Sequence, residues 1–125
     1  MRVLVDSHVF LWWAEDKPIP ERVTEILEDP ENDLLFSMAS AWELALKLDR
    51  LGLANRFEPL LQGAIRELGL EILGIQLSHI TYSGTLPWHH RDPFDRILVA
   101  QALLEGVPIL TADKKIAQYP VHVLW

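Results

Sequence analysis

The sequence predicts an α/β fold in three layers, in which a mainly parallel central sheet of four to five strands is flanked by helices. Short apolar runs such as residues 3–5 lack polar alternation, so the sheet is expected to be covered on both faces. Amphipathic helical patterns separate these runs along the chain. Strands that alternate with helices pair in parallel through right-handed crossovers. The 125 residues are expected to form a single domain, residues 1–125.

The expected strands are short and follow turn-forming residues. Asn32 and Asp33 precede the second strand, and glycines at positions 69 and 106 precede the third and fourth. In chain order, the expected strands cover residues 3–5, 34–36, 70–75, 107–111 and 121–124.

Most of the expected helices have a recognisable beginning or end. Ser7 can cap the first helix, Pro20 suits the start of the second, and Asp92 before Pro93 is a natural N-cap. Glycine follows the third, fourth and sixth helices, where it can end a helix in the left-handed conformation. The expected helices cover residues 8–14, 20–28, 38–51, 59–68, 78–85 and 94–105, with a helical turn over 114–118.

The composition is that of a globular protein, because half of the residues are hydrophobic and 23% are charged. No apolar run reaches the ~18 residues of a membrane span, and no charged leader with an apolar core marks export. The chain has no cysteine, which excludes disulfides and thiolate metal sites. These features predict a cytoplasmic location.

Four acidic residues lie where a parallel sheet would gather them at one edge. Asp6 ends the first strand and Asp113 follows the fourth, while Glu43 and Asp95 lie in the first turns of helices. The carboxyl ends of parallel strands and the amino ends of helices share one edge, where ligands bind. Four carboxylates there repel one another unless a cation joins them. The pattern therefore predicts Mg²⁺ or Mn²⁺ and the phosphate chemistry of these ions.

The net charge of −7 is unusual for a protein that handles nucleic acid. Much of the acidity is local, since residues 1–33 hold nine Asp or Glu against three Lys or Arg. Bound divalent ions would also reverse the effective charge of the acidic edge. The charge therefore argues against a passive nucleic-acid binder more than against a metal-dependent nuclease.

The acidic residues also have structural interpretations. For Asp6 a purely structural role is the least convincing, since a charged side chain directly after a buried strand has no packing role. Glu43 could complete a capping box with Ser40 or pair with Lys47 one helical turn later. Asp95 could contribute to a helix cap, although its position favours a place at the acidic edge.

Other polar residues near the predicted edge are ambiguous in the same way. Asp92 is interpreted chiefly as a helix cap, and Asp113 equally well as a site residue or as part of a solvated turn. Ser7 and Thr111 could hold a metal-bound water or a phosphate, or could serve only as cap and strand-end hydroxyls.

Two pairs of adjacent ring side chains complete the candidates. His89 and His90 lack a third His or Cys at ligand spacing, so they are expected to face solvent or to hydrogen-bond to their loop. Trp12 and Trp13 cannot both face inward comfortably, so one of them is expected to line a partner surface.

Taken together and in this order, the motifs resemble the PIN-domain ribonucleases, and most closely the VapC-type toxins of bacterial toxin–antitoxin modules. The resemblance covers essentially the whole chain, and residues 92–102 are its most specific part. The segments that carry it are VLVDSH (residues 3–8), SMASAWELALK (37–47), HRDPFDRILVAQA (90–102) and LTAD (110–113).

The resemblance places the acidic quartet of the family on the four residues of the predicted edge, and Ser7 where the family often has Thr or Ser. It implies a Mg²⁺- or Mn²⁺-dependent endoribonuclease that acts as a toxin, forms a homodimer and is blocked by a VapB-like antitoxin. Asp92 belongs to the motif, with its contact to metal left open. Lys47, Arg91 and Arg96 are candidates for guiding the RNA backbone.

Two other functions fit parts of the pattern. A phosphatase or receiver-like domain would phosphorylate Asp6, but it would need a second acid where His8 stands. A non-enzymatic binding module would recruit a partner through exposed tryptophans and leave the acidic quartet unexplained. Calorimetric titration with Mn²⁺ separates the nuclease from the module, because the module is expected to give no heat of binding.

Overall fold

The computed structural model describes residues 1–125 and confirms the α/β fold. Five strands form one sheet in the order β3-β2-β1-β4-β5, and every neighbouring pair is parallel. The strands are β1 (Arg2–Val5), β2 (Asp33–Ser37), β3 (Glu71–Leu73), β4 (Ile109–Leu110) and β5 (Val123–Leu124). The first strand therefore lies in the centre of the sheet, with crossovers running from it in both directions.

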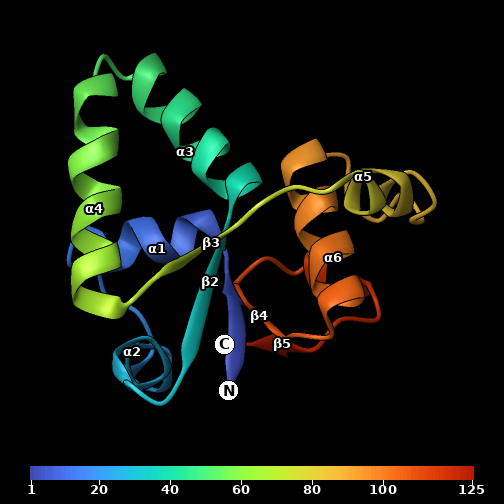
Figure 1. The fold of residues 1–125 in the computed structure, drawn as a ribbon, viewed down its shortest axis with the longest axis horizontal. Helices are drawn as coiled ribbons and strands as arrows, with labels where there is room; N and C mark the ends of the chain where they lie inside the picture. The colour runs from blue at the N-terminus through green and yellow to red at the C-terminus, as the bar shows by residue number, and fades with distance from the viewer.

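Helices cover both faces of the sheet, as Figure 1 shows. The first four helices pack with one face of the sheet, and α6 covers the other with α5 packed against it. The helices are α1 (Ser7–Ala14), α2 (Glu21–Glu28), α3 (Met38–Arg50), α4 (Phe57–Leu68), α5 (Leu77–Ser83) and α6 (Pro93–Glu105). Two short 3₁₀ turns complete the helical elements: Ala54–Arg56 lies between α3 and α4, and Ile116–Gln118 lies between β4 and β5.

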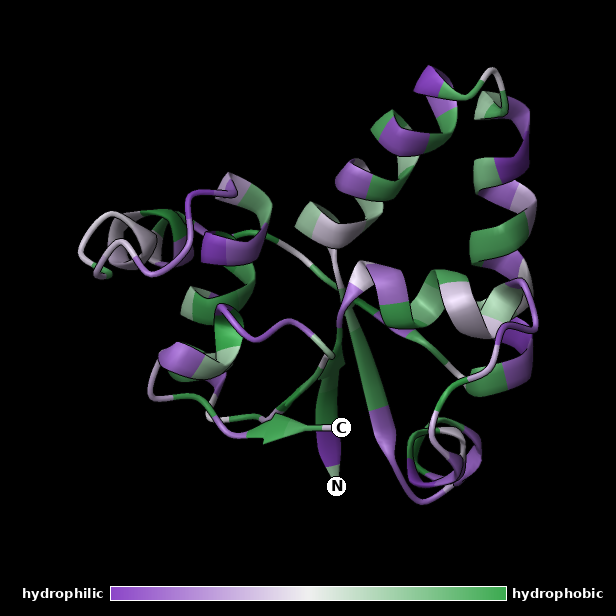
Figure 2. Cartoon of the chain, turned by 180° about the vertical axis from the view of Figure 1, so that it is seen from behind, coloured by the Kyte–Doolittle hydropathy of each residue, from purple (hydrophilic) through white to green (hydrophobic).

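The apolar run of β1 has the burial that a doubly covered strand requires. Val3 and Val5 belong to the core under the first four helices, whereas Leu4 belongs to the core under α6. All three are at most 1% exposed. Figure 2 shows the hydrophobic run of β1 after its polar first residue. Alternate side chains of one strand thus supply two separate cores, which joins the three layers.

The helix ends follow the local chemistry with one correction. Asp92 caps α6 and Pro93 opens it, while Gly69 and Gly106 end α4 and α6 in the left-handed conformation at φ 66°. The expectation that Ser7 caps the first helix is wrong. Asp6 is the N-cap and accepts a hydrogen bond from the Ser7 amide, so α1 begins one residue earlier.

The element boundaries differ in smaller ways. The third, fourth and fifth strands are shorter than their apolar runs, because only part of each run pairs with a neighbouring strand. The fourth helix begins at Phe57, two residues before Pro59, so this proline lies inside its first turn. None of the helices has the length and apolar character that crossing a membrane requires.

Candidate active site

The carboxyl edge of the sheet brings the predicted acidic residues together in two groups that share Asp95. Potential ligand atoms of Asp6, Glu43 and Asp95 all lie within 4.8 Å of one another. Asp113 belongs to the second group, with Asp95 and His90, under the same limit. The quartet is therefore divided, because Asp113 joins Asp95 through His90 and does not belong to the group of Asp6 and Glu43.

Asp6 is buried and its carboxylate is surrounded by hydrogen-bond donors. The Ser7 amide donates to Oδ1 at 2.7 Å, and the Thr111 hydroxyl donates to Oδ2 at 2.7 Å. Nδ1 of His8 lies 3.3 Å from Oδ2. Because Nε2 of His8 accepts from the Ala112 amide at 3.2 Å, the proton of this ring is on Nδ1 and points toward Asp6. These donors hold an ionised carboxylate in one orientation.

Glu43 faces the same edge from the second turn of α3. The Ser7 hydroxyl donates to its Oε1 at 2.5 Å. Burial raises the pKa of Glu43, and the charges of Asp92 and Asp6 add to this, while the Ser7 hydrogen bond and Lys47 work against it. A cation bound beside Glu43 would lower this pKa again, so the carboxyl group would ionise when the cation binds.

The structural interpretation of Glu43 is wrong. The N-cap of α3 is Ser37, which accepts from the Ala39 amide at 3.0 Å, so Ser40 and Glu43 lie inside the helix and form no capping box. No ion pair joins Glu43 to Lys47, whose side chain is exposed.

Asp95 lies in the environment of this edge that is least favourable to an ionised carboxylate. Burial, and then the charges of Asp6, Asp92, Glu43 and Asp113, raise its pKa to about 8. Without a cation this carboxyl is therefore largely protonated at neutral pH. A divalent ion at the edge would offset the part of the pKa shift that comes from the neighbouring negative charges.

Asp113 has its two carboxylate oxygens in different environments. Oδ1 accepts from the Lys115 amide at 2.7 Å in a tight turn, while Oδ2 lies 2.9 Å from Nε2 of His90. Burial acts to raise its pKa, but the hydrogen bonds from His90 and from the Lys115 and Ile116 amides outweigh burial and lower it. The turn that was expected at Asp113 is therefore present, and its second oxygen lies among the potential ligand atoms of the edge.

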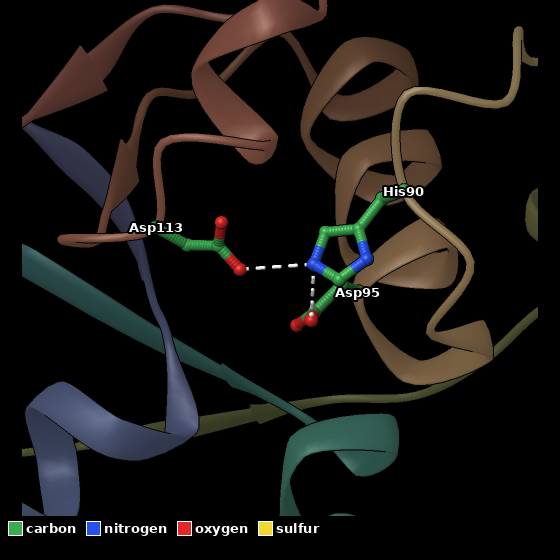
Figure 3. A group of neighbouring side chains, drawn as sticks. All are labelled: His90, Asp95 and Asp113. Atoms are coloured by element: carbon green, nitrogen blue, oxygen red, sulfur yellow. Dashed lines mark hydrogen bonds and ion pairs between the residues drawn. The ribbon is translucent and has the colours of Figure 1, made fainter.

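His90 is the residue of this edge that sequence reasoning missed. Its Nε2 lies 2.9 Å from Asp95 and 2.9 Å from Asp113, so the ring bridges the two carboxylates, as Figure 3 shows. Nδ1 accepts from the Asp92 amide at 3.2 Å, which leaves the proton of a neutral ring on Nε2. The expectation that both histidines face solvent or hydrogen-bond to their loop holds for His89, which is exposed, and for Nδ1 of His90, which bonds to the loop. The burial of His90 and the contacts of its Nε2 with two carboxylates were not predicted.

The main chain of His90 is held as firmly as its ring. Its amide donates to the Tyr119 hydroxyl at 3.0 Å, and its carbonyl accepts from Arg96 at 3.4 Å. The one sequence signal that could have identified it is its place in the segment of residues 90–102, five residues before Asp95.

Arg96 does not have the exposed position that guiding an RNA backbone requires. Its side chain is 6% exposed, and its guanidinium donates to the carbonyls of Ser83, Leu86 and Pro87. It therefore holds the loop before α6 in place. Lys47 and Arg91 are exposed and remain free to contact a polyanion.

Asp92 acts as the predicted helix cap. Its Oδ1 accepts from the Phe94 amide at 2.9 Å. It belongs to neither group of potential metal ligands, although its charge contributes to the raised pKa values of Glu43 and Asp95.

The donor set at the edge fits a hard divalent cation. It consists of clustered carboxylates with neighbouring hydroxyls and the imidazole of His90, and it contains no thiolate. Carboxylate oxygens suit Mg²⁺ and Mn²⁺, and the crowding that raises the pKa of Asp95 is the crowding that such an ion relieves.

Comparison with known proteins gives one family and a consistent set of folds. Residues 3–121 match the profile of the PIN domain. No curated protein matches the chain in sequence. Several solved structures share its fold at low sequence identity.

Three of these structures illustrate the likeness. A chain of VapBC2 from Rickettsia felis, bound to a DNA fragment from its promoter, has a TM-score of 0.79 and 15% identity, covering 99% of this chain and 98% of that one. A chain of DNA-bound VapBC from Salmonella typhimurium has a TM-score of 0.77 and 16% identity, covering 99% of this chain and 97% of that one. VapC20 from Mycobacterium tuberculosis, a sarcin–ricin loop cleaving toxin, has a TM-score of 0.69 and 11% identity, covering 95% of each chain.

Proposed function

The chain belongs to the PIN domain family, and from that membership and its acidic edge we propose that it is a Mg²⁺- or Mn²⁺-dependent endoribonuclease, the toxin of a toxin–antitoxin pair. The observation that carries the proposal is the group formed by Asp6, Glu43 and Asp95, whose ligand atoms lie within 4.8 Å of one another. Carboxylates so close together in a buried setting are costly unless a cation binds them.

The proposed metal ligands are Asp6, Glu43 and Asp95, with Asp113 as an outlying member. A bound divalent ion would supply an activated water and neutralise charge that develops on the scissile phosphate. Ser7 orients Glu43, while Thr111 and the Ser7 amide orient Asp6.

A protein nucleophile is not favoured by the contacts. Ser7 is hydrogen-bonded to Glu43, and the nitrogen of His8 that could take a proton already accepts from the Ala112 amide. The phosphatase alternative is disfavoured for a similar reason, because both oxygens of Asp6 are engaged by donors. Water is therefore the nucleophile that the site suits best.

Calorimetric titration with Mn²⁺ tests the proposal. We expect heat of binding with the wild-type chain and at least a 10-fold weaker affinity when Asp95 is replaced by Asn, since one ligand of the set is lost. Cleavage of an unstructured RNA in Mn²⁺ or Mg²⁺ should show the same dependence. No heat and no cleavage with the folded wild-type protein would leave the non-enzymatic binding module as the better function.

The role of His90 gives a second expectation. Because the Asp92 amide fixes the ring proton on Nε2, His90 should act as a donor that orients Asp95 and Asp113 and not as a metal ligand. Replacement by Leu removes this donor and should weaken Mn²⁺ binding about 10-fold or more.

The matched variant is His90→Gln, whose side-chain amide still carries N–H groups. It should retain Mn²⁺ affinity within a few-fold of wild type, with thermal melts confirming that both variants fold. Equal losses in the Leu and Gln variants would show that the donated hydrogen bond is not what matters.

We further propose a homodimer and a VapB-like antitoxin as partners. The structure of a toxin–antitoxin complex from Klebsiella pneumoniae, at 18% identity and a TM-score of 0.66, is among those with the same fold. A shallow groove of about 160 Å³ between α1 and α4, lined in part by Trp13 and Leu60, would suit an apolar antitoxin segment. Exposed Leu77, Ile80 and Leu104 on α5 and α6 offer an apolar surface to a second copy.

The positions of Trp12 and Trp13 bear on the expectation that one of them faces a partner. Both rings are half-buried: Trp12 packs against His8 and Trp125, while Trp13 packs against the core and reaches the groove. Trp13 is therefore the better candidate for an antitoxin contact.

A further inference from the structure

Two strongly exposed tryptophans lie beside the candidate active site. Trp42 is 60% exposed and immediately precedes Glu43 on α3, and Trp88 is 74% exposed in the loop two residues before His90. A tryptophan ring left in water forgoes more hydrophobic stabilisation than most other side chains. Two such rings at one edge therefore call for a functional reason.

Each of the two tryptophan rings packs against a residue that is adjacent to Asp95 in the sequence. Trp42 packs edge-on against Phe94, with ring centroids 5.1 Å apart and an interplanar angle of 89°. The Arg96 guanidinium carbon lies 3.9 Å from the centroid of the Trp88 ring. Each ring therefore has a fixed support while much of its surface remains open.

The two residues that support the rings, Phe94 and Arg96, lie on either side of Asp95 along α6. Successive residues of an α-helix are rotated by about 100° around its axis, so residues 94 and 96 project to the two sides of residue 95. A phosphate that reaches the acidic edge would have one aromatic ring on each side. Trp42 approaches from α3 and Trp88 from the loop before α6.

The charges around the site limit how a polyanion can be held. The chain has a net charge of −7, and Arg96, the basic residue next to Asp95, is committed to backbone carbonyls inside the protein. Apart from a bound metal, attraction for phosphates rests on a few exposed basic residues such as Lys47 and Arg91, so contacts to the bases would add to the affinity. Exposed aromatic rings bind unpaired bases by stacking, without dependence on base identity.

We propose that Trp42 and Trp88 are stacking platforms for the nucleobases on the two sides of the scissile phosphate. The substrate is then an RNA segment whose flanking bases are unpaired, because a duplex hides the base faces that the rings would contact. A protein partner fits this surface less well, since an apolar segment that covered both rings would also cover the carboxylates between them. The inference rests on the proposed nuclease function.

The test is the affinity for a short unstructured RNA of about ten nucleotides, measured by fluorescence anisotropy in Ca²⁺ with the RNA shown to stay intact. We expect Trp42→Leu and Trp88→Leu each to weaken binding about 10-fold. Trp→Phe at either position keeps an aromatic face and should retain most of the affinity. Leu51→Ala, a change at another strongly exposed residue (66%) just after α3, should leave affinity unchanged.

An abasic substitution identifies the contact directly. Removing one base beside the cleavage position should weaken binding to the wild-type protein but have little further effect on the Leu variant that lost the matching ring. A fully paired duplex of the same length should bind at least 10-fold more weakly than the single strand.

The outcomes separate the two proposals. If the wild-type chain binds Mn²⁺ and cleaves RNA while the folded Leu variants bind RNA normally, the stacking inference is wrong and the nuclease function stands. In that case a changed affinity for a second copy or for an antitoxin would assign the rings to a protein interface. If the wild-type chain neither binds Mn²⁺ nor cleaves RNA, the proposed function itself fails.

Unchanged Mn²⁺ affinity in the Leu variants shows that a loss of RNA binding is not due to a damaged metal site.

Discussion

Asp95→Asn is expected to abolish RNA cleavage and at the same time to raise the thermal stability of the metal-free protein. Cleavage is lost because Asp95 is the residue shared by both groups of potential ligands. Stability rises because burial and neighbouring negative charges raise the pKa of this carboxyl to about 8, so ionising it in the folded chain is costly. The neutral amide avoids that cost.

The effect should depend on pH in a defined direction. The folded carboxyl has a pKa of about 8 against 3.8 for its ordinary value, so between these values the folded chain retains a proton that the unfolded chain has released. The stability contributed by the protonated group is complete below pH 3.8 and is lost as the pH rises through about 8. In EDTA, the melting temperature of the wild type should therefore fall from pH 5 to pH 9 more steeply than that of the Asn variant. At pH 8 the variant should melt about 5 °C higher.

Asp92→Asn is the matched control, since it makes the same chemical change on the same helix. Asn caps a helix about as well as Asp, and Asp92 lies outside both ligand groups, so cleavage should change only a few-fold. If Asp95→Asn cut RNA at a rate near that of wild type, or if Asp92→Asn lost as much activity with its fold intact, the assignment of the site would have to change.

Asp6→Asn is expected to abolish cleavage as well, but to lower stability. Relief of charge repulsion alone would make this variant as stable as wild type or more so. The contacts reverse that expectation, because Asp6 accepts hydrogen bonds from the Ser7 amide and the Thr111 hydroxyl and faces the protonated Nδ1 of His8. The amide group of Asn must turn its own N–H groups toward one of these donors.

A buried donor left without an acceptor costs about 1–3 kcal/mol, which corresponds to a fall in melting temperature of roughly 4–15 °C. His8 cannot relieve the conflict by moving its proton, because its other nitrogen accepts from the Ala112 amide. Thermal melts and RNA cleavage of the purified variant measure both effects. Asp49→Asn, at an exposed position on α3, is the control and should change neither. A variant at position 6 that was both more stable and active would contradict the hydrogen-bond network described for Asp6.

Much of the fold follows from short-range patterns in the sequence. The apolar run that contains Val3 and Val5 predicts a strand covered on both faces, and glycine and proline at the helix ends predict several boundaries. Asp6 and Asp95 could be placed at one edge because a parallel sheet puts the ends of its strands beside the beginnings of its helices. These inferences depend only on neighbours in the chain and on a general topological rule.

The partners of the site residues were decided only by the tertiary structure. Ser7 meets Glu43 across 36 residues of chain, and His90 meets Asp113 across 23. The same local sequence allowed Glu43 to cap a helix, His90 to face solvent and Arg96 to contact a substrate. The start of α3 at Ser37 excluded the cap, and packing between elements excluded the other two possibilities, because it fixed which donor faces which acceptor at distances near 3 Å. Local sequence determines which elements form and where they end, whereas contacts between distant side chains depend on how those elements pack in three dimensions.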